Sequence, residues 1–339
     1  MAEETCIGLL SPFFVPIPAY ERPAAELGVK LAVVTPSRID WQREEVEGLV
    51  WDGSSWQQQI LPIPKAFYNR FYGPKPKVVN RLELLLGKNK VFNHVTRFDK
   101  LEVHNALSAT ELQEYLPETA AYRPERLLEV LDSRGQVILK PRRGRLGVGI
   151  YLIRKKGKRF QIHLGTKSPI MSFSSQQELA AWLEDAFDGG WLIQEFIPLA
   201  KVDGRPFDVR ILVQKDGNGA WQPSGGLSRS AFRHSYITNV NHALRPADQV
   251  LDRAFPGQKL LPQLEAISLQ AAEFLEEAAG SLGEISVDFG LESSGTIWII
   301  ELNAKPMKSL FRSIGGESLL KTVYKRPLEY ALHLSKGDG

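Results

Sequence analysis

Two strongly apolar segments near the end of the printed sequence constrain the fold more than any other feature. Ile285–Leu291 and Thr296–Asn303 are separated by a polar four-residue turn, which predicts an antiparallel β-hairpin. Counting back from that turn places Asp288 opposite Ile299. Because side chains alternate between the two faces of a strand, this register decides which residues of the hairpin share a face.

Three polar side chains interrupt these apolar strands and are predicted to meet on one face. Ile299, Glu301 and Asn303 share a face through the period of two, and Asp288 lies on the same face of the partner strand. Two carboxylates and an amide oxygen are hard ligands, suited to Mg²⁺ ions that also hold nucleotide phosphates. The alternative is a polar face wetted by solvent, which is less attractive on such apolar strands. Asp288, Glu301 and Asn303 are therefore the predicted metal ligands.

The rest of the chain is predicted to be α/β, with two main regions. Residues 1–90 form a small α/β region without a recognisable catalytic motif, and residues 91–339 alternate helical patterns with short strands. Besides the hairpin, strands are expected at Val137–Lys140, Ile150–Arg154, Trp191–Phe196 and Phe207–Val213. Helices are expected at Asp99–Leu107, Arg123–Arg134, Ser174–Phe187 and Leu261–Ala279. Pro124 and Gly135 bound the second helix, and Ser174 with Gln177 makes a capping box for the third.

A lysine at the end of a predicted strand directly precedes a turn rich in glycine and arginine. Lys140 is followed by Arg142–Gly149, which contains Gly144, Gly147 and Gly149. Glycines let backbone N–H groups approach phosphate oxygens closely, and the basic side chains add positive charge, so the turn is a candidate flap over phosphates. Ordinary hairpin turns with basic residues have the same pattern, so this segment alone does not decide between the two interpretations.

A second period-two pair of polar residues lies at Asp208 and Arg210, whose side chains point to one face of a strand. Arg210 is either half of a structural ion pair or a ligand of a transferred phosphate. Arg229 and Arg233 follow a pair of glycines and either extend the same positive surface or lie outside it.

Several motifs of other nucleotide-using enzymes are absent from the sequence or stand in the wrong order. Asp288–Gly290 spells the DFG of protein kinases, but the glycine turn follows Lys140 and no HRD triplet exists. There is no Walker GxxxxGK[ST], and no GxGxxG lies between a strand and a helix. None of the six histidines has HExxH spacing, so structural or surface roles are their default.

The composition argues against nucleic acid, membrane and secreted disulfide proteins. The net charge is +3, and Lys and Arg are spread among almost as many Asp and Glu, so nucleic acid is an unlikely partner. Cys6 is the single cysteine, which excludes an internal disulfide and fits a reducing compartment. No run of eighteen apolar residues occurs, and the apolar segment from Cys6 to Ile17 is a poor signal peptide. The expected location is the cytoplasm.

The order of these features resembles the ATP-grasp superfamily from about residue 91 onward. The segments that carry the resemblance are Asp99-Lys100, Leu139–Pro141, the glycine flap, Ile193–Ile197, Asp208-x-Arg210, Asp288 and Glu301-x-Asn303. Details such as Phe92–His94 and Gly283–Asp288 are more similar to the YheC/YheD endospore coat-associated family than to RimK-type ligases. The resemblance implies an ATP-grasp fold with an N-terminal preATP-grasp α/β subdomain. Within residues 91–339, it implies a flap-bearing subdomain at about 120–197 and a metal-binding subdomain at about 198–339.

The same resemblance assigns roles to individual residues. Lys100 and Lys140 would hold ATP phosphates, and Arg210 would meet the transferred phosphate beside Lys140. The metal ligands would bind two Mg²⁺ ions, with Mn²⁺ as the alternative. The adenine would be held through Glu195 and backbone groups of a hinge made of Gln194, Glu195, Phe196 and Ile197. Asp203 or Lys201 would reach the ribose.

The implied activity is a carboxylate–amine ligation that proceeds through an acyl phosphate. The substrate would be an amino acid or a peptide-like molecule. The first alternative is a nucleotide-binding structural or spore-coat protein without ligase turnover, and the second is a small-molecule kinase on the same scaffold. If the relation to the spore-coat family holds, the protein would be made in the cytoplasm and end in the coat. The sequence indicates neither the substrates nor an oligomeric state.

The loop after Asn303 departs from the pattern of many ATP-grasp ligases. It reads Ala304–Lys308, without the Pro-Gly that commonly follows. Its two lysines, Lys305 and Lys308, either bind an acidic substrate or are simply exposed, and the sequence does not choose between these. Another segment, Phe67–Lys77, is aromatic and basic, which favours a folded aromatic cluster over a partner surface.

Overall fold

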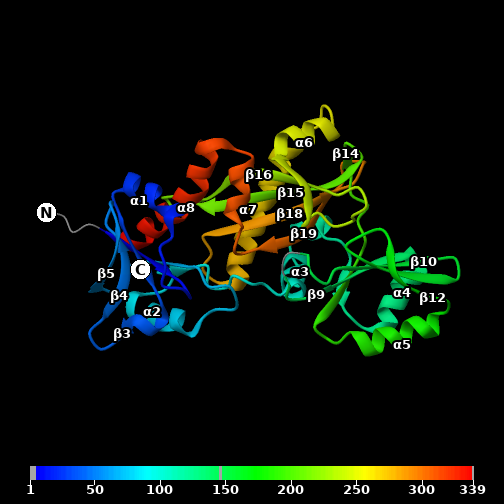
Figure 1. Ribbon diagram of the computed structural model, residues 1–339, viewed down its shortest axis with the longest axis horizontal. Coiled ribbons are helices and arrows are strands. Elements are labelled where there is room, and N and C mark those ends of the chain that lie inside the picture. Colours follow the sequence, from blue (N-terminus) through cyan, green and yellow to red (C-terminus); the bar gives the residue numbers. More distant parts are fainter. Residues whose placement is uncertain (1–4, 145–146, 338–339) are drawn as a thin grey trace.

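Three β-sheets lie along the long axis of the molecule (Figure 1). The computed structural model describes residues 5–144 and 147–337. We call the sheets the N-terminal sheet, the central sheet and the flap sheet. Figure 1 shows the central sheet between the other two, so each end of it faces a different neighbour.

The N-terminal sheet holds the first ninety residues together and also includes a strand just after them. Its strands are β1 (Cys6–Leu10), β2 (Lys30–Val34), β3 (Ile39–Asp40), β4 (Glu45–Trp51), β5 (Trp56–Pro62), β6 (Phe67–Asn69) and β7 (Val91–Phe92). The order is β3-β4-β2-β1-β6-β7, with β5 paired to β4, and β1, β2, β6 and β7 run parallel. Parallel strands require cover on both faces, because both faces of such a sheet are apolar.

Helices from distant parts of the chain supply that cover. One face packs on α1 (Glu21–Leu27) and on α8 (Gly316–Lys336), the last helix described, while the other face packs on α2 (Lys77–Leu86). The alternation is visible in β1, where Leu9 joins the core of α8 and Leu10 joins the core of α2. In Figure 1, α8 (red) lies beside α1 (blue).

The flap sheet is antiparallel and carries the glycine turn between two of its central strands. Its strands are β8 (Thr119–Ala121), β9 (Gln136–Pro141), β10 (Tyr151–Lys156), β11 (Arg159–Leu164), β12 (Pro169–Phe173) and β13 (Trp191–Gln194), in the order β12-β11-β10-β9-β13-β8. Two helices, α4 (Pro124–Arg134) and α5 (Gln176–Ala186), cover its apolar face.

The observed ends of these two helices can be compared with the ends that the sequence predicted. As predicted, α4 begins at Pro124 and ends before Gly135, which has the left-handed φ of 71° that a glycine tolerates. The capping box of α5 lies one residue later than predicted. Ser175 is the N-cap and accepts a hydrogen bond from the backbone N–H of Glu178 at 3.3 Å, because the helix starts at Gln176.

The central sheet is antiparallel and contains the predicted hairpin. Its strands are β14 (Lys201–Val202), β15 (Arg205–Lys215), β16 (Trp221–Ala231), β17 (Asn241–Pro246), β18 (Glu284–Leu291) and β19 (Ile297–Asn303), in the order β17-β16-β15-β18-β19 with β14 paired to β15. The helices α3 (Lys100–Ser108), α6 (Ala247–Ala254) and α7 (Leu260–Ala279) cover one face. Short 3-10 helices lie at Pro18–Tyr20, Pro36–Arg38, Glu111–Tyr115 and Lys308–Ser313. The other face of the sheet carries the polar residues of the candidate site.

The hairpin of β18 and β19 forms as predicted, but the predicted register is wrong. Asp288 pairs with Glu301 and not with Ile299, which pairs with Phe289. The physical reason is a β-bulge. Between the pairs Asp288–Glu301 and Phe289–Ile299, strand β19 contains one extra residue, Ile300, that has no partner in β18. The bulge turns Ile300 as well as Glu301 toward the site.

The predicted convergence of the polar residues survives because two errors of register cancel. The turn is one residue longer than expected, since Leu291 pairs with Ile297, and the bulge adds one more residue. A total shift of two keeps Asp288 on the same face as Glu301, because the side-chain period is two. Ile299 instead lies in the core on the opposite face, which corrects the prediction that it shares a face with Glu301.

No helix within the described ranges combines the length and apolar character needed to cross a bilayer.

Candidate functional site

Two adjoining cavities lie on the polar face of the central sheet. The first has a volume of about 710 Å³ and lies between the central sheet and the flap sheet. The second has a volume of about 1420 Å³ and lies between the central sheet and the N-terminal sheet. Arg229, Asn239 and Glu301 line both cavities, so the two meet at these residues.

Five residues predicted to bind ATP and two of the three predicted metal ligands line the first cavity. They are Lys140, Gln194, Glu195, Phe196, Ile197, Asp288 and Glu301. Aliphatic side chains of Ile138, Ile150, Ile197 and Ile300 provide apolar walls. An apolar slot with a charged end suits a ligand that has a flat base and phosphates.

Lys140 is a buried cation that forms no ion pair with any carboxylate of the described residues. It is 4% exposed, and its Nζ donates to Gln194 Oε1 at 2.8 Å and to the Ile300 carbonyl at 3.5 Å. Burial lowers the pKa of Lys140 to about 8, against the opposing effect of the Glu301 carboxylate. A phosphate oxygen near Nζ would therefore stabilise the charged form.

Lys100 lies at the first turn of α3 and faces the same site. Its Nζ is 3.5 Å from Glu301 Oε1 and donates to the Gly144 carbonyl at 3.3 Å. Asp99 caps this helix and also pairs with Arg142 at 2.8 Å and with Arg143 at 3.3 Å. These contacts attach the base of the glycine flap to the start of α3.

The flap glycines occupy positions where a side chain would be crowded, and at Gly147 and Gly149 also strained. Gly147 has a φ of 72°, and a Cβ there would lie 2.9 Å from Asn239 Nδ2. Gly149 has a φ of 75° and faces Trp191, and Gly144 lies against Pro141 and Lys100 Nζ. The flap thus touches Asn239 at the junction of the two cavities. Arg145 and Leu146, which belong to the predicted flap, lie outside the described residues.

A buried ion-pair cluster forms the floor at this junction. Arg210 donates to both Asp288 carboxylate oxygens, at 2.6 and 2.7 Å, and Arg229 donates to Asp288 at 2.9 Å. Asp208 pairs with Arg229 and accepts from the Thr238 hydroxyl. Burial alone would raise the pKa of Asp288, but Arg210 and Arg229 outweigh it and lower that pKa to about 2. Arg210 is thus part of a structural ion pair here, and its role toward a phosphate stays a prediction.

The donor atoms of the predicted metal ligands converge. Asp288 is the neighbour of Glu301 across the hairpin, and Asn303 Nδ2 lies 3.5 Å from Asp288 Oδ2. Within the ranges that the structure describes, Glu301 forms an ion pair with Lys100 alone, which leaves its oxygens able to accept further ligands. Among the described residues no three His, Cys, Asp or Glu side chains cluster as a metal site, so the amide of Asn303 is needed to complete the set.

The charges around this set bear on the form in which a metal ion can bind. Lys100, Lys140, Arg210 and Arg229 surround three carboxylates, those of Asp208, Asp288 and Glu301. A bare divalent cation is repelled by this excess of positive charge, whereas a cation that arrives with a polyphosphate brings negative charge with it. The residues therefore fit Mg²⁺ as a complex with a nucleotide.

The hinge after β13 lines the first cavity, but one of its predicted contacts points elsewhere. The Glu195 carboxylate pairs with Arg134 and accepts from the Glu118 N–H at 3.4 Å, and the Glu195 N–H donates to the Glu118 carbonyl at 2.8 Å. A base in the cavity would thus rely on neighbouring backbone groups and on the ring of Phe196, over which Arg154 lies at 5.5 Å.

Three other residues singled out in the sequence lie outside both cavities. Asp203 is in the exposed turn between β14 and β15, where it pairs with Arg245 and Arg253. Lys201 is exposed in β14, and the carbonyl of the exposed Arg233 accepts a hydrogen bond from Lys167 at 2.9 Å. The structure does not bring Asp203 to the other predicted ligands.

The second cavity brings together residues of the aromatic and basic segment Phe67–Lys77 and the two lysines whose role the sequence left open. Tyr68 and Arg70 come from the N-terminal sheet, where no catalytic pattern was recognised, and Lys305 and Lys308 come from the loop after β19. Lys308 is 4% exposed and Lys305 is half-buried, so the interpretation that both are simply exposed is wrong. Burial lowers the pKa of Lys305 to about 8.

Comparisons with known proteins place this geometry in a family. Residues 88–334 match a family described as YheC/D like ATP-grasp. The endospore coat-associated protein YheD of Bacillus subtilis is 26% identical over 88% of this chain and 69% of its own length. YheC of the same organism is 25% identical over 92% of this chain and 90% of its own length.

A solved structure shares the fold. The ATP-grasp ligase PsnB, determined in complex with a minimal precursor, superposes with a TM-score of 0.56 at 14% identity, over 98% of this chain and all of that one. At this identity the likeness shows the fold alone. The predicted α/β ATP-grasp fold is confirmed.

Proposed function

The chain belongs to the YheC/D-like ATP-grasp family, and we propose that it is a Mg·ATP-dependent carboxylate–amine ligase that acts on an amino-acid or peptide-like substrate. The observation that carries the proposal is the junction of the two cavities at Arg229, Asn239 and Glu301. A nucleotide in the first cavity and a carboxylate in the second would meet there. The ATP-grasp fold binds ATP and Mg²⁺, and the solved neighbours of this chain include ligases.

The charged residues have separate roles in this proposal. Lys100 and Lys140 hold the phosphates, while Asp288, Glu301 and Asn303 hold Mg²⁺. When bound, the metal neutralises charge on the phosphate oxygens. We propose two ions, with Mn²⁺ as a substitute, because the ligands are oxygen atoms.

The proposed reaction has two steps. An oxygen of the substrate carboxylate bonds to the γ-phosphorus while the bond from that phosphorus to ADP breaks, which gives an acyl phosphate. The amine nitrogen then attacks the acyl carbon, phosphate leaves with the carbon–oxygen bond pair, and the nitrogen loses a proton. Lys140 and Arg210 offset charge during the first step. The flap excludes water, which would otherwise hydrolyse the intermediate.

Calorimetric titration of Mg·ATP tests the nucleotide site. We expect wild type to bind only when the metal is present, and the Glu301→Ala/Asn303→Ala variant to lose about a hundredfold or more in affinity. Glu277→Ala, an exposed carboxylate on α7, is the matched control and should bind like wild type. Folded wild type that binds no Mg·ATP would discard the proposal.

A second candidate follows from the names of the two relatives, which are called endospore coat-associated proteins. In that case the chain binds nucleotide as a structural or coat-associated protein without ligase turnover. Mg·ATP-dependent phosphate release stimulated by an amino acid or peptide pair supports the ligase. ATP binding without turnover across a broad panel supports the coat protein. We propose synthesis in the cytoplasm in both cases, with the spore coat as the later location in the second.

A further inference from the structure

The second cavity is strongly basic. Five cationic side chains line it, and one carboxylate, that of Glu301, does so. The cations are Arg70, Arg210, Arg229, Lys305 and Lys308. Basic walls around a partly buried cavity favour an anionic occupant, since charge interactions are stronger where water is excluded.

Three of the five cations are already paired with carboxylates. Arg210 pairs with Asp288, and Arg229 pairs with Asp208 and Asp288. Lys308 pairs with Glu284, a carboxylate that is 1% exposed. These cations therefore belong to the structure of the cavity, and their charge is largely offset before any substrate arrives.

The other two cations contact neutral oxygen atoms only, among the hydrogen bonds of the described residues. Arg70 donates to the Tyr20 hydroxyl at 2.6 Å and to the Tyr68 hydroxyl at 3.4 Å. Lys305 donates to the backbone carbonyl of Arg70. Both side chains are half-buried, and the Glu284 carboxylate acts on them only from beyond ion-pair distance, because it pairs directly with Lys308. Each therefore keeps a positive charge that a bound anion could offset.

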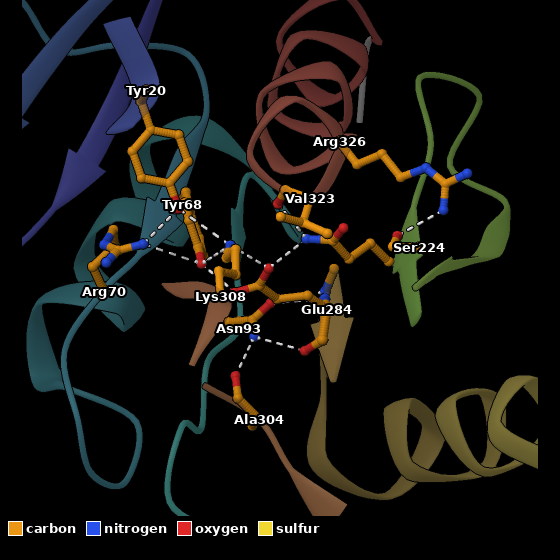
Figure 2. A network of polar contacts seen from close by, with 12 residues as sticks. Tyr20, Tyr68, Arg70, Asn93, Ser224, Glu284, Ala304, Lys308, Val323 and Arg326 are labelled. Atoms are coloured by element: carbon orange, nitrogen blue, oxygen red, sulfur yellow. Dashed lines mark hydrogen bonds and ion pairs between the residues drawn. The ribbon is translucent and has the colours of Figure 1, made fainter. Parts of the chain in front are cut away.

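Arg70 is held in place before a substrate binds. Figure 2 shows it beside Tyr20 and Tyr68, with Lys308 and Glu284 on the other side of the tyrosines. The guanidinium carbon lies 5.2 Å from the centre of the Tyr20 ring, and Lys308 Nζ donates to the Tyr20 and Tyr68 hydroxyls at 3.2 and 3.0 Å. A fixed guanidinium loses little entropy when it binds an anion.

We propose that the second cavity takes a substrate with an anionic group additional to the carboxylate that reacts, and that Arg70 and Lys305 receive this group. The inference rests on the proposed function, which places the reacting carboxylate at the junction with the first cavity. The substrate class is an acidic amino acid, or a peptide that carries an acidic or phosphorylated side chain. The second cavity is larger than the first and opens to solvent, so a ligand as long as a dipeptide can extend out of it.

Calorimetric titrations with matched probes test this inference, in the presence of Mg²⁺ and a non-hydrolysable ATP analogue. The acidic probes are L-glutamate, L-glutamyl-L-glutamate and O-phospho-L-serine, and the neutral counterparts are L-glutamine, L-glutaminyl-L-glutamine and L-serine. We expect at least one acidic probe to bind about tenfold or more tightly than its counterpart. Whether a carboxylate or a phosphate probe binds best distinguishes the two sources of the anion.

Two variants and one control identify the residues responsible. Lys305→Met and Arg70→Gln are each expected to reduce the preference for the acidic probe by about tenfold, with unchanged affinity for Mg·ATP. Lys158→Met removes an exposed lysine in the turn between β10 and β11 and should change neither quantity. If Arg70→Gln does not fold, Lys305→Met decides alone. Equal binding of acidic and neutral probes, or a preference that survives in the folded variants, overturns the inference.

Phosphate release with the same probes separates this inference from the proposed function. Turnover with neutral probes alone means that the ligase proposal stands and that the inference of a second anionic group on the substrate is wrong. If an acidic probe binds tightly, the binding depends on Lys305 and no turnover occurs, the inference of a second anionic group stands and the ligase proposal is wrong.

Discussion

Single charges decide how the first cavity can receive a nucleotide. Lys140 is buried beside Gln194 and, within the described part of the chain, has no carboxylate within ion-pair distance, whereas Lys100 pairs with Glu301. The charge of Lys140 is therefore the one that a phosphate would stabilise most. The protonation state of the Lys140 amine can therefore be used to test how the site binds a nucleotide.

The affinity for Mg·ATP is expected to fall as the pH rises above about 8. The pKa of Lys140 is lowered to about 8 in the free protein, so the amine is charged below that pH and neutral above it. Bound phosphate raises the pKa, so each pH unit between the two values costs up to about tenfold in affinity. Calorimetry at a series of pH values from about 7 to 9.5 measures the profile.

Lys140→Arg is the control for this pH dependence. A guanidinium stays protonated throughout the range, so the variant should bind more weakly but with a flatter profile than wild type. An equal decline in wild type and variant would assign the titration to another group, and a flat wild-type profile would contradict the proposed role of Lys140.

The sequence identified site residues only where chemistry and spacing coincide locally. Asp288, Glu301 and Asn303 were predicted together because side chains on a strand alternate with a period of two, and a register error of two residues leaves that shared face unchanged. Arg70 was missed because its partners, Tyr20 and Lys305, are far away in the chain and no local pattern connects them. Such contacts depend on how the sheets pack together, and the periodicity of a single strand does not predict that packing.

Among the elements of the site, we expect the glycine flap to be the one whose function is most affected by an added side chain. Gly147 combines a left-handed φ of 72° with a position where an added Cβ would lie 2.9 Å from Asn239 Nδ2. Gly147→Ala is expected to cost about 1–2 kcal/mol in backbone strain and to push the flap away from Asn239. We expect the affinity for Mg·ATP to fall by about tenfold, as measured by calorimetry.

Gly157→Ala is the control that separates the effect of backbone strain from the effect of the clash with Asn239. Gly157 has a similar φ of 63°, but a Cβ there would meet nothing within 4 Å. The control should lower the free energy of unfolding by a similar amount and leave nucleotide binding unchanged. Equal loss of affinity in both variants would show that general destabilisation, and not the contact with Asn239, explains the effect.

The elements themselves were predictable to different degrees, for physical reasons. The strand β18 and the helix α4 were found because apolar runs and terminal Pro and Gly residues define them. The strands β16 and β17 were not predicted, since Pro223 and the paired glycines of β16 resemble a turn. Tertiary pairing with β15 overrides that local preference.

At the scale of the molecule, one buried network connects the N-terminal sheet with the central sheet. Lys308 pairs with Glu284 of β18, while Tyr68 of β6 donates to the same carboxylate (Figure 2). Gln214 of β15 also donates to Glu284, at 2.8 Å. Breaking this network should thus affect both sheets together.

Lys308→Met is expected to lower the free energy of unfolding by about 3–5 kcal/mol, because it leaves the Glu284 charge buried without its partner. Unfolding in urea, followed by circular dichroism, measures the change. The Lys308→Met/Glu284→Gln double variant should recover part of it, since no charge is then unpaired. Lys325→Met, which breaks a more exposed pair with Glu329, should cost about 1 kcal/mol or less. Similar losses in both single variants would contradict this account.

The position of α8 on the N-terminal sheet has a consequence for the way the protein is made. Leu328 and Ala331 complete the core around Leu9, yet more than two hundred residues separate β7 from α8. A ribosome that adds about 5–20 residues per second needs roughly 10–45 s to reach α8 after it has finished β7. During that time α1 covers only part of that apolar face of the nascent sheet, so a chaperone that shields the part later covered by α8 would raise the yield of folded protein.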